Sequence, residues 1–461
     1  MAYTQNYHAL NGSSFAGIFS MYNNPAGIVN CDYKWDLNLF SAQGTITNTA
    51  ATLKNFSLSN YDSAYIDFTN GRRSRFLHTT VDINLFNFRI KLDEKSALGI
   101  GFRARSYNHS KMASFFYTDT VTTLPGFLHI NTNTDYLSGY VTHSGWLEAD
   151  IDYARIISSN DHQRISAGVT LGILKSISGA EAQANRFTYQ ETLNANNQYN
   201  YYANGGNAMA AYSSNYDLLD GNRSTAANAK TFLKNTTTHL SLSLGAEILL
   251  KDFSPYAEEE ISSTNYDWKI GVSIMDIGKN TFTPNGGAFY TAIPDSGVSA
   301  ARLENIVSNA TSMKRFRDSM LNVFQITDTI TDPFAISLPT RLLLSVDRNL
   351  GNHFYINGQL NVNFYSTQQP SGKIRTRELN LLTITPRWET RTLGFYLPIQ
   401  YNTQGQLWIG SAIKLGPFLL GFHNIGWILG KQFKDLNGGG YFAFHFTPKP
   451  KQEKTRLDCF N

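Results

Sequence analysis

Apolar and polar side chains alternate with a period of two along most of the chain. In the segment 165–173, Ile165, Val169 and Ile173 fall on one face, while serine, glycine and threonine fall on the other. This alternation is typical of β-strands whose two faces meet different surroundings. The pattern predicts about 14 strands. They cover residues 35–39, 81–85, 98–104, 147–153, 165–173, 240–244, 266–274, 342–346, 354–364, 379–389, 391–401, 406–415, 417–424 and 438–447.

The connections between these expected strands alternate in length. Short turns such as 93–96 follow the even-numbered strands, whereas long polar loops such as 176–235 and 277–338 follow most odd-numbered ones. Within the last of these loops, 298–321 contains apolar residues at the spacing of a short helix. Transmembrane β-barrels have short turns on the periplasmic side and longer loops outside. The sequence therefore predicts an all-β fold, a transmembrane antiparallel β-barrel with large extracellular loops.

The chemistry of the two strand faces favours the same fold. A water-soluble barrel with this many strands would have an interior too wide for side chains to fill. In a membrane, the apolar face contacts lipid and the interior can be polar. Trp35, Trp146, Trp268 and Trp408 lie near expected strand ends, where they could form interfacial girdles. A soluble all-β fold stays open until the protein is shown to need detergent.

The segment ahead of the first strand, 1–32, is rich in small, apolar and turn-forming residues. Glycine, asparagine and proline interrupt it too often for a membrane-spanning helix. We expect this segment to lie inside the barrel as a plug or hatch. The barrel would then occupy 33–447, and a basic periplasmic tail would occupy 448–461.

The composition limits the other classes of protein. Charged residues make up 16% of the 461 residues, below the usual share of about 25%. The net charge of +4 carries no nucleic-acid signature, and the lack of long apolar runs disfavours a helical membrane protein. Met1 to Gln5 lack the charged start of a signal peptide, so an exported protein would be represented by its mature sequence. No nucleotide-binding motif or metal-ligand spacing predicts a cofactor.

Three short motifs carry a resemblance to a known family. Asn24-Pro25-Ala26-Gly27 resembles the Asn-Pro-Ala-Gly segment in the N-terminal hatch of the FadL-like outer-membrane barrels. Met275-Asp276-Ile277-Gly278 and His423-Asn424-Ile425-Gly426 resemble the Asn-Leu-Gly strand endings of the same barrels. The family includes transporters of hydrophobic compounds and the PorV protein of type IX secretion. The first motif also suits an ordinary turn, because asparagine and proline favour turn initiation in any fold.

The resemblance implies a location in the bacterial outer membrane and a gating role for the plug residues 24–27. It implies lipid, hydrophobic small molecules, or a secretion or surface-protein assembly as partners. The leading hypothesis is passive transport of small hydrophobic molecules or lipids, in which the plug shifts or a kinked strand leaves a lateral opening. The alternative is a non-transporting, PorV-like accessory or shuttle component. An enzyme is not expected, because it would need a convergent site of serine, histidine and acidic side chains in the barrel wall.

Charged residues recur on the polar face of two neighbouring expected strands. Arg103 and Arg105 lie on one strand, and Glu148, Asp150 and Asp152 lie on the next. Antiparallel pairing brings such residues opposite one another. Inside a barrel they would form either a polar constriction or, as we favour, an ion-pair ladder that satisfies buried charges.

Two further features suggest chemistry more weakly. His143 and Ser144 are adjacent, as in some hydrolase motifs, but neighbouring strand residues point to opposite faces, so they make a poor catalytic pair. Cys31 precedes the first strand and Cys459 follows the last. Both termini of an even-stranded barrel lie on the periplasmic side, where disulfides can form. We therefore predict a Cys31–Cys459 disulfide that ties the tail to the barrel base.

Overall fold

The computed structural model describes residues 7–54, 65–194, 199–218, 223–234, 236–251, 261–284, 288–310, 313–330, 332–364, 374–378, 380–426 and 437–448. The strands of the barrel are β1 (Trp35–Asn48), β4 (Gly71–Lys91), β5 (Ser96–Tyr117), β6 (Leu137–Ser159), β7 (Gln163–Leu193), β9 (Thr237–Leu250), β10 (Trp268–Phe282), β15 (Arg341–Gly351), β16 (Phe354–Asn363), β18 (Leu381–Glu389), β19 (Leu393–Tyr396), β20 (Ile399–Asn402), β21 (Leu407–Ile409), β22 (Ser411–Leu415), β23 (Phe418–Phe422) and β24 (Gly438–Phe446).

The remaining elements lie in the plug and in the connections. The helices are η1 (His8–Leu10), η2 (Gly17–Tyr22), η3 (Pro25–Ile28), η4 (Ser214–Leu218), α1 (Leu124–His129), α2 (Thr225–Phe232), α3 (Ala300–Ser308) and α4 (Met313–Leu321). The strands are β2 (Ala51–Lys54), β3 (Tyr65–Phe68), β8 (Tyr199–Tyr212), β11 (Ala288–Ala292), β12 (Val298–Ser299), β13 (Gln325–Ile330), β14 (Phe334–Ser337) and β17 (Ile374–Arg375). Among the helices that the described residues form, none is long and apolar enough to cross a bilayer.

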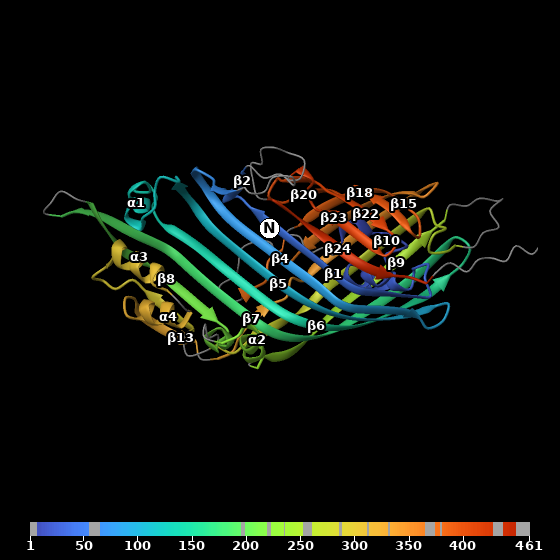
Figure 1. Cartoon of the computed structure of the whole chain (residues 1–461), viewed down its shortest axis with the longest axis horizontal. Coiled ribbons are helices and arrows are strands. Elements are labelled where there is room, and N and C mark those ends of the chain that lie inside the picture. The colour runs from blue at the N-terminus through green and yellow to red at the C-terminus, as the bar shows by residue number, and fades with distance from the viewer. Residues whose placement is uncertain are drawn as a thin grey trace, which may run out of the picture.

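The barrel is closed and antiparallel, which confirms the predicted fold (Figure 1). Its 14 positions follow the chain order, with β19 and β20 sharing one position and β21 and β22 sharing the next. The ring closes where β1 pairs with β24, from Leu37 opposite Phe446 to Ile46 opposite Gly438. A closed barrel leaves no unpaired sheet edge, which is what a bilayer requires of a spanning sheet.

The two faces of the barrel have opposite polarity. Outward residues such as Leu171 and Ile151 are 56% and 53% exposed, whereas inward residues such as Asn84 and Thr383 are fully buried. An apolar outer surface and a polar interior are the arrangement of a barrel that stands in lipid. Two expected girdle residues do not fit this picture, because Trp146 and Trp408 are buried inside the barrel. Their strands turn these side chains inward.

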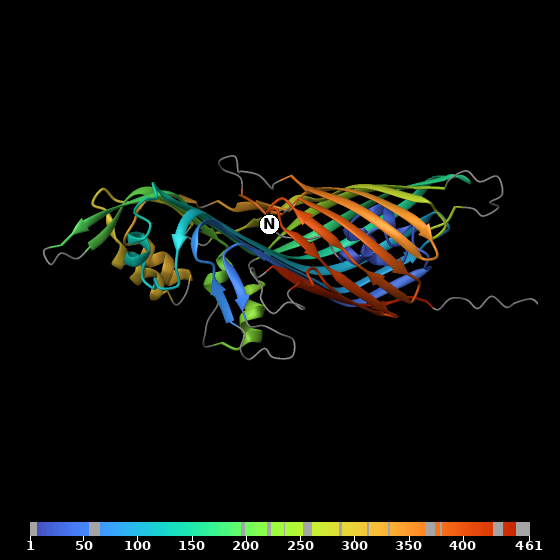
Figure 2. The same ribbon diagram turned by 90° about the horizontal axis from the view of Figure 1, so that it is seen from above.

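The plug fills one end of the barrel (dark blue in Figure 2). Its three short helices, η1, η2 and η3, are separated by turns, and most of their residues are buried. Apolar plug residues such as Phe19 and Ile18 pack against inward side chains of the wall. This end is the one with the short turns between β4 and β5 and between β6 and β7 (Figure 1).

The opposite end extends into a head that the alternation pattern did not predict (Figure 1). Strand β7 continues for 31 residues, well past the expected end at 173, and pairs there with β8. The expected loops 105–144 and 176–235 are therefore largely strand. The predicted short helix at 298–321 is present as two helices, α3 and α4.

Candidate functional site

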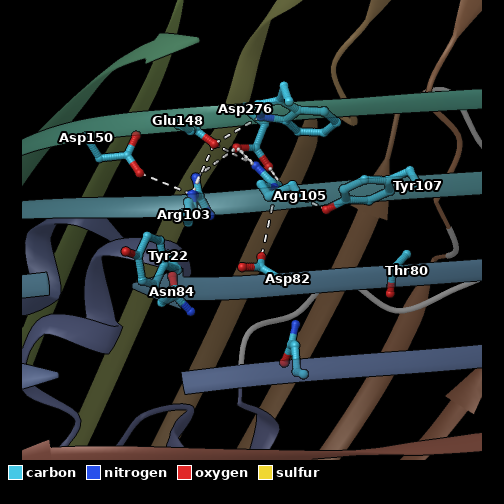
Figure 3. Close-up of polar contacts among 12 residues, drawn as sticks. Tyr22, Thr80, Asp82, Asn84, Arg103, Arg105, Tyr107, Glu148, Asp150 and Asp276 are labelled. Carbon is cyan, nitrogen blue, oxygen red and sulfur yellow. Dashed lines mark hydrogen bonds and ion pairs between the residues drawn. The ribbon is translucent and has the colours of Figure 1, made fainter. Parts of the chain in front are cut away.

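A network of ion pairs crosses the lumen at the level of β5 and β6 (Figure 3). Arg103 Nε lies 3.0 Å from Glu148 Oε2 and 3.1 Å from Asp150 Oδ2. Arg105 donates hydrogen bonds of 2.9 Å and 3.0 Å to the two carboxylate oxygens of Asp276. All five side chains are almost completely buried. The structure therefore brings four of the five predicted lumenal charges together and adds Asp276.

Asp276 reaches this network from a wall that is not adjacent to β5. It lies on β10, and β6, β7 and β9 separate the two strands around the barrel. The register of β10 against β9 shifts between Ile274 and Ile277, and Asp276 takes a left-handed backbone conformation with φ 58°. A bulge of this kind re-aims a side chain. The Asp276 backbone N–H donates to Ser243 Oγ at 3.0 Å, which holds the bulge.

Arg341 on β15 extends the network further around the barrel. Its guanidinium lies 2.7 Å from Asp276 Oδ2 and 3.8 Å from Glu378 Oε2, and it donates to the carbonyl of Tyr22 in the plug at 3.2 Å. Pairing offsets the cost of burying these charges away from water. We call the set the lumenal partition. It consists of Asp82, Arg103, Arg105, Glu148, Asp150, Asp276, Arg341 and Glu378.

Asp152, the fifth predicted lumenal charge, does not join the arginines. It points inward as the strand period requires, but the residue opposite it on β5 is Gly99. Asp152 lies beside the plug residue Ile18. The strand period predicted its face correctly. Its separation from Arg103 depends on the register between the strands, which the sequence pattern does not determine.

One end of the plug is anchored where the barrel closes. Arg89 on β4 donates to the carbonyls of Ile28 at 3.0 Å and Tyr33 at 2.6 Å, and it is ion-paired with Asp36 on β1. Asp36 also contacts His445 on β24 at 2.9 Å. We call Asp36, Arg89 and His445 the seam cluster. It joins the plug to the first, second and last strands of the ring.

A second set of polar groups holds the other end of the plug. Lys269 and Arg387 both donate to the carbonyl of Gly12, at 3.1 Å and 3.2 Å. The Ser13 hydroxyl donates to Glu389 at 2.7 Å. Hydrogen bonds that involve a charged partner are stronger than neutral ones. The plug is therefore bound to the wall at both ends by buried, charge-assisted contacts.

The predicted motif 24–27 lies between these anchors. The Asn24 side chain donates to the carbonyl of Ala246 on β9 at 2.9 Å, and its oxygen accepts from the backbone N–H of Ala26 at 3.1 Å. The second bond caps η3, and Pro25 occupies the first helical position, where its missing N–H costs nothing. The motif therefore shapes the turn and also fastens it to the wall.

Glycines of the wall make room for this turn. A side chain at Gly168 would overlap the backbone of Pro25, and one at Gly245 would overlap the amide of Asn24. These two glycines pair with each other across β7 and β9. Gly27 is packed against Ser20 within the plug. A gating role for 24–27 stays a prediction.

The described residues include only one cysteine of the predicted disulfide. Cys31 is buried in a small cluster with Phe15 and Tyr33 at the base of the barrel. Cys459 lies outside the described residues. The pairing stays a prediction.

The wall beside the partition contains a pocket of about 230 Å³. We call it the wall pocket. Its lining combines residues of the outer face and the lumenal face of β4–β7, namely Val81, Ile83, Ala104, Arg105, Ser106, Gly145, Trp146, Ile177 and Ser178. The β6–β7 register shifts at Gly145 and Trp146, so Ile177 has no partner in the ladder. The bulge thus lies at the wall pocket.

An apolar patch lies on the lumenal side of the same wall. Tyr107 and Trp146 stack with ring centroids 5.2 Å apart, and Leu174 and Leu338 pack with them. Arg105 of the partition lies over the Trp146 ring at 5.0 Å. The patch therefore adjoins the partition, and its Trp146 is also one of the residues that line the wall pocket.

His143 and Ser144 lie on opposite faces of β6, as the strand period predicts. Ser144 is buried on the lumenal side, where it accepts a hydrogen bond from Asn280 at 3.3 Å. His143 lies on the outer side, beside Asn108 and Ser178. The two do not form a catalytic pair.

Four partition residues escaped the sequence analysis, namely Asp82, Asp276, Arg341 and Glu378. The sequence analysis noted Asp276 only as part of the strand-ending motif 275–278. A charged residue at the end of an apolar strand is the signal that could have marked it as lumenal. Arg341 begins β15 directly after a long connection, and no pattern marks it as lumenal.

Residues 25–422 match the model of a protein family described as a family of unknown function (DUF5723). The chain belongs to this family. No curated protein matches this chain.

Three solved structures of channels and transporters are similar to the chain at low identity. The FadL homologue of Pseudomonas aeruginosa is 11% identical with a TM-score of 0.43, covering 96% of this chain and 98% of that one. The toluene transporter TbuX of Ralstonia pickettii is 11% identical with a TM-score of 0.41, covering 94% of each chain. The P. putida toluene transporter TodX is 8% identical with a TM-score of 0.42, covering 94% and 95%.

The closed 14-stranded barrel confirms the predicted architecture from the structure of the chain itself, whereas similarity to PorV stays a prediction. The closed barrel with its apolar outer surface is an outer-membrane β-barrel, as predicted.

Proposed function

We propose that this barrel passes small hydrophobic molecules across the outer membrane by passive diffusion, and that they leave sideways through the wall. The observation that carries the proposal is the position of the wall pocket relative to the partition. The partition places eight buried charged side chains across the lumen, and an apolar molecule gains nothing by displacing them. An axial route for such a molecule is therefore closed.

The lumenal apolar patch and the wall pocket together avoid this barrier. A hydrophobic molecule on Tyr107 and Trp146 would stand beside the pocket, whose outer lining of Val81, Ile83 and Ala104 faces lipid. Aromatic and aliphatic side chains are the usual lining of sites for apolar ligands. Movement of the bulge at Ile177 would join the patch to the pocket.

The test fills the wall pocket from outside. We expect Ala104→Phe to slow uptake of the fluorescent hydrophobic probe N-phenyl-1-naphthylamine by about tenfold, because one aromatic ring occupies much of the pocket. Ala149→Phe is the matched control, since Ala149 also faces outward, on β6 opposite Phe102, but does not line the pocket. Equal uptake by the two variants would contradict the lateral route.

The alternative of an accessory or shuttle barrel in a secretion or surface assembly stays a prediction. Purification in mild detergent with a stoichiometric protein partner and no enriched hydrophobic molecule would favour it over transport.

A further inference from the structure

Three side chains on the outer face of the wall form a hydrogen-bonded relay. His143 Nε2 lies 2.7 Å from Ser178 Oγ, and His143 Nδ1 lies 2.6 Å from Asn108 Oδ1. The three residues come from the adjacent strands β6, β7 and β5. A nucleophile, a base within hydrogen-bond reach and a third group that orients the base are the signature of covalent acyl transfer.

The hydrogen bonds around Asn108 determine the form of the imidazole. The Asn108 side-chain nitrogen donates to Thr79 Oγ1 at 3.2 Å, so the amide oxygen faces His143. An amide oxygen only accepts, and His143 Nδ1 must therefore carry its hydrogen. The neutral ring then presents the lone pair of Nε2 to the Ser178 hydroxyl. This is the tautomer that a general base needs.

The relay lies at the outer border of the apolar surface. On β5 the outward residues change from Phe102 and Ala104 to Ser106 and Asn108, in the direction away from the plug end. The ester bonds of membrane lipids lie between the hydrocarbon core and the headgroups, and the proposal below places that level at this change. The relay thus faces the lipid region where ester groups are found.

The wall pocket lies next to the serine. Ser178 is part of its lining, together with Val81, Ile83 and Ala104. Gly145, directly opposite Ser178 on β6, leaves room beside the hydroxyl, since a side chain there would stand 2.7 Å from Ser178 Oγ. A hydrocarbon chain in the pocket would place the carbonyl at its end beside the serine.

We propose that Ser178, His143 and Asn108 form a hydrolytic site for acyl esters of membrane lipids, with the wall pocket as the acyl-chain site. Ser178 and His143 are the catalytic residues, and Asn108 is a positioning residue. The inference goes beyond the proposed transport: it shares the wall pocket with the proposed exit route and adds Ser178, His143 and Asn108.

The reaction needs only the ester and water. Ser178 Oγ attacks the ester carbonyl carbon while its proton passes to His143 Nε2. The C–O bond to the alcohol then breaks, His143 returns that proton to the departing alkoxide oxygen, and an acyl-serine remains. A water molecule attacks the acyl-serine, giving its proton to His143, and the proton returns to Ser178 as the free fatty acid leaves.

The Tyr216 hydroxyl is placed to stabilise the oxyanion of this reaction. It belongs to η4, and its ring lies 6.5 Å from that of His143, the residue bonded to Ser178. Burial raises the pKa of Tyr216, so the hydroxyl stays protonated and able to donate. A donor directed at developing negative charge is a main source of rate enhancement in acyl transfer.

The test uses the full chain, purified in detergent, with p-nitrophenyl octanoate and with vesicles of dioleoyl phosphatidylethanolamine as substrates. We expect release of acyl product and covalent labelling of Ser178 by a fluorophosphonate, located by peptide mass spectrometry. Ser178→Ala should lower turnover by about a thousandfold, as loss of a triad nucleophile does. Ser144→Ala, which changes the lumenal serine next to His143 on β6, should leave turnover unchanged.

Asn108 is tested by rescue. Asn108→Ala should lower turnover by at least about tenfold, whereas Asn108→Asp keeps an acceptor for Nδ1–H and should restore most of it with a changed pH profile. Turnover and labelling in the wild type no greater than in Ser178→Ala would overturn the proposal. Hydrolysis of the octanoate ester alone would restrict the site to short free esters and overturn its assignment to membrane lipids.

The outcome of the hydrolysis test does not depend on the outcome of the uptake test. Normal uptake without hydrolysis removes this inference alone, and hydrolysis without uptake removes only the proposed transport.

Discussion

The two faces of one wall segment, formed by β5 and β6, differ in nearly every chemical respect. Arg105 and Glu148 point inward into a partition of paired, buried charges. Ser106 and His143 point outward, where the side chains are neutral and adjoin an apolar pocket. Consecutive strand residues point to opposite faces, so two unrelated sites share one stretch of backbone. The comparison shows that register keeps them apart, because a slip of one residue would exchange them.

The largest expected effect on stability comes from removing a carboxylate of the partition on the inner face. Asp276→Ala would leave Arg105 and Arg341 without the carboxylate that bridges them, and loss of one member of a buried ion pair costs about 3–5 kcal/mol. Thermal unfolding in detergent micelles, followed by the mobility shift on gel electrophoresis, measures the change. Asp328→Ala, at an exposed carboxylate of β13, is the control and should cost less than about 0.5 kcal/mol. Equal midpoints for the two variants would show that the partition contributes no stability.

The next largest effect is expected where the plug packs against the inner face of the wall. Gly245→Ala would force a methyl group into the Asn24 amide, and overpacking of this kind costs about 1–3 kcal/mol. Gly358→Ala makes the same change on β16, where the added atom would meet only the carbonyl of Val346 at 3.9 Å. We expect only the first variant to lower the unfolding midpoint and to make the plug accessible to protease. A plug equally protected in both would mean that Gly245 is not part of its seat.

A smaller effect is expected on the outer face. Gly145→Ala places a methyl group against Ser178 Oγ, and we expect about tenfold slower fluorophosphonate labelling, equivalent to roughly 1.4 kcal/mol. Stability should change little, since the site is at the surface of the wall. Gly44→Ala, whose added atom would meet only the Thr80 carbonyl at 3.7 Å, should label at the wild-type rate. Unchanged labelling in Gly145→Ala would separate the wall pocket from the relay.

The smallest effect concerns the motif that the sequence singled out. Asn24→Ala removes the bond to the Ala246 carbonyl and the cap of η3, which together should cost about 1–2 kcal/mol at most. Asn24→Asp keeps the cap acceptor and loses only the donor, so it should cost about half as much. Denaturant midpoints for the pair measure the difference. Equal losses would assign the whole effect to the bond with Ala246.

The strand period accounts for what the sequence could predict. It yielded the barrel and the inward direction of Arg103, Arg105 and Glu148, because a period of two relates sequence directly to face. It also separated His143 from Ser144. These are all statements about one strand at a time.

The missed features depend on relations between strands. Asp276 enters the partition through a bulge and from across the lumen, and Ser178 meets His143 through a register that a bulge offsets. Neither follows from periodicity within one strand. The extension of β7 was missed because its outer part is no longer bounded by lipid on one face, and the alternation fades there.

The seam cluster has a consequence for how the molecule assembles. Asp36 on β1 acquires its His445 contact only when β24, the final strand of the ring, has arrived. Arg89 reaches the Ile28 and Tyr33 carbonyls only when the plug is already inside. A ring that closed around an empty lumen would bury a guanidinium short of two acceptors. Closure of the barrel and docking of the plug are therefore one cooperative event during biogenesis.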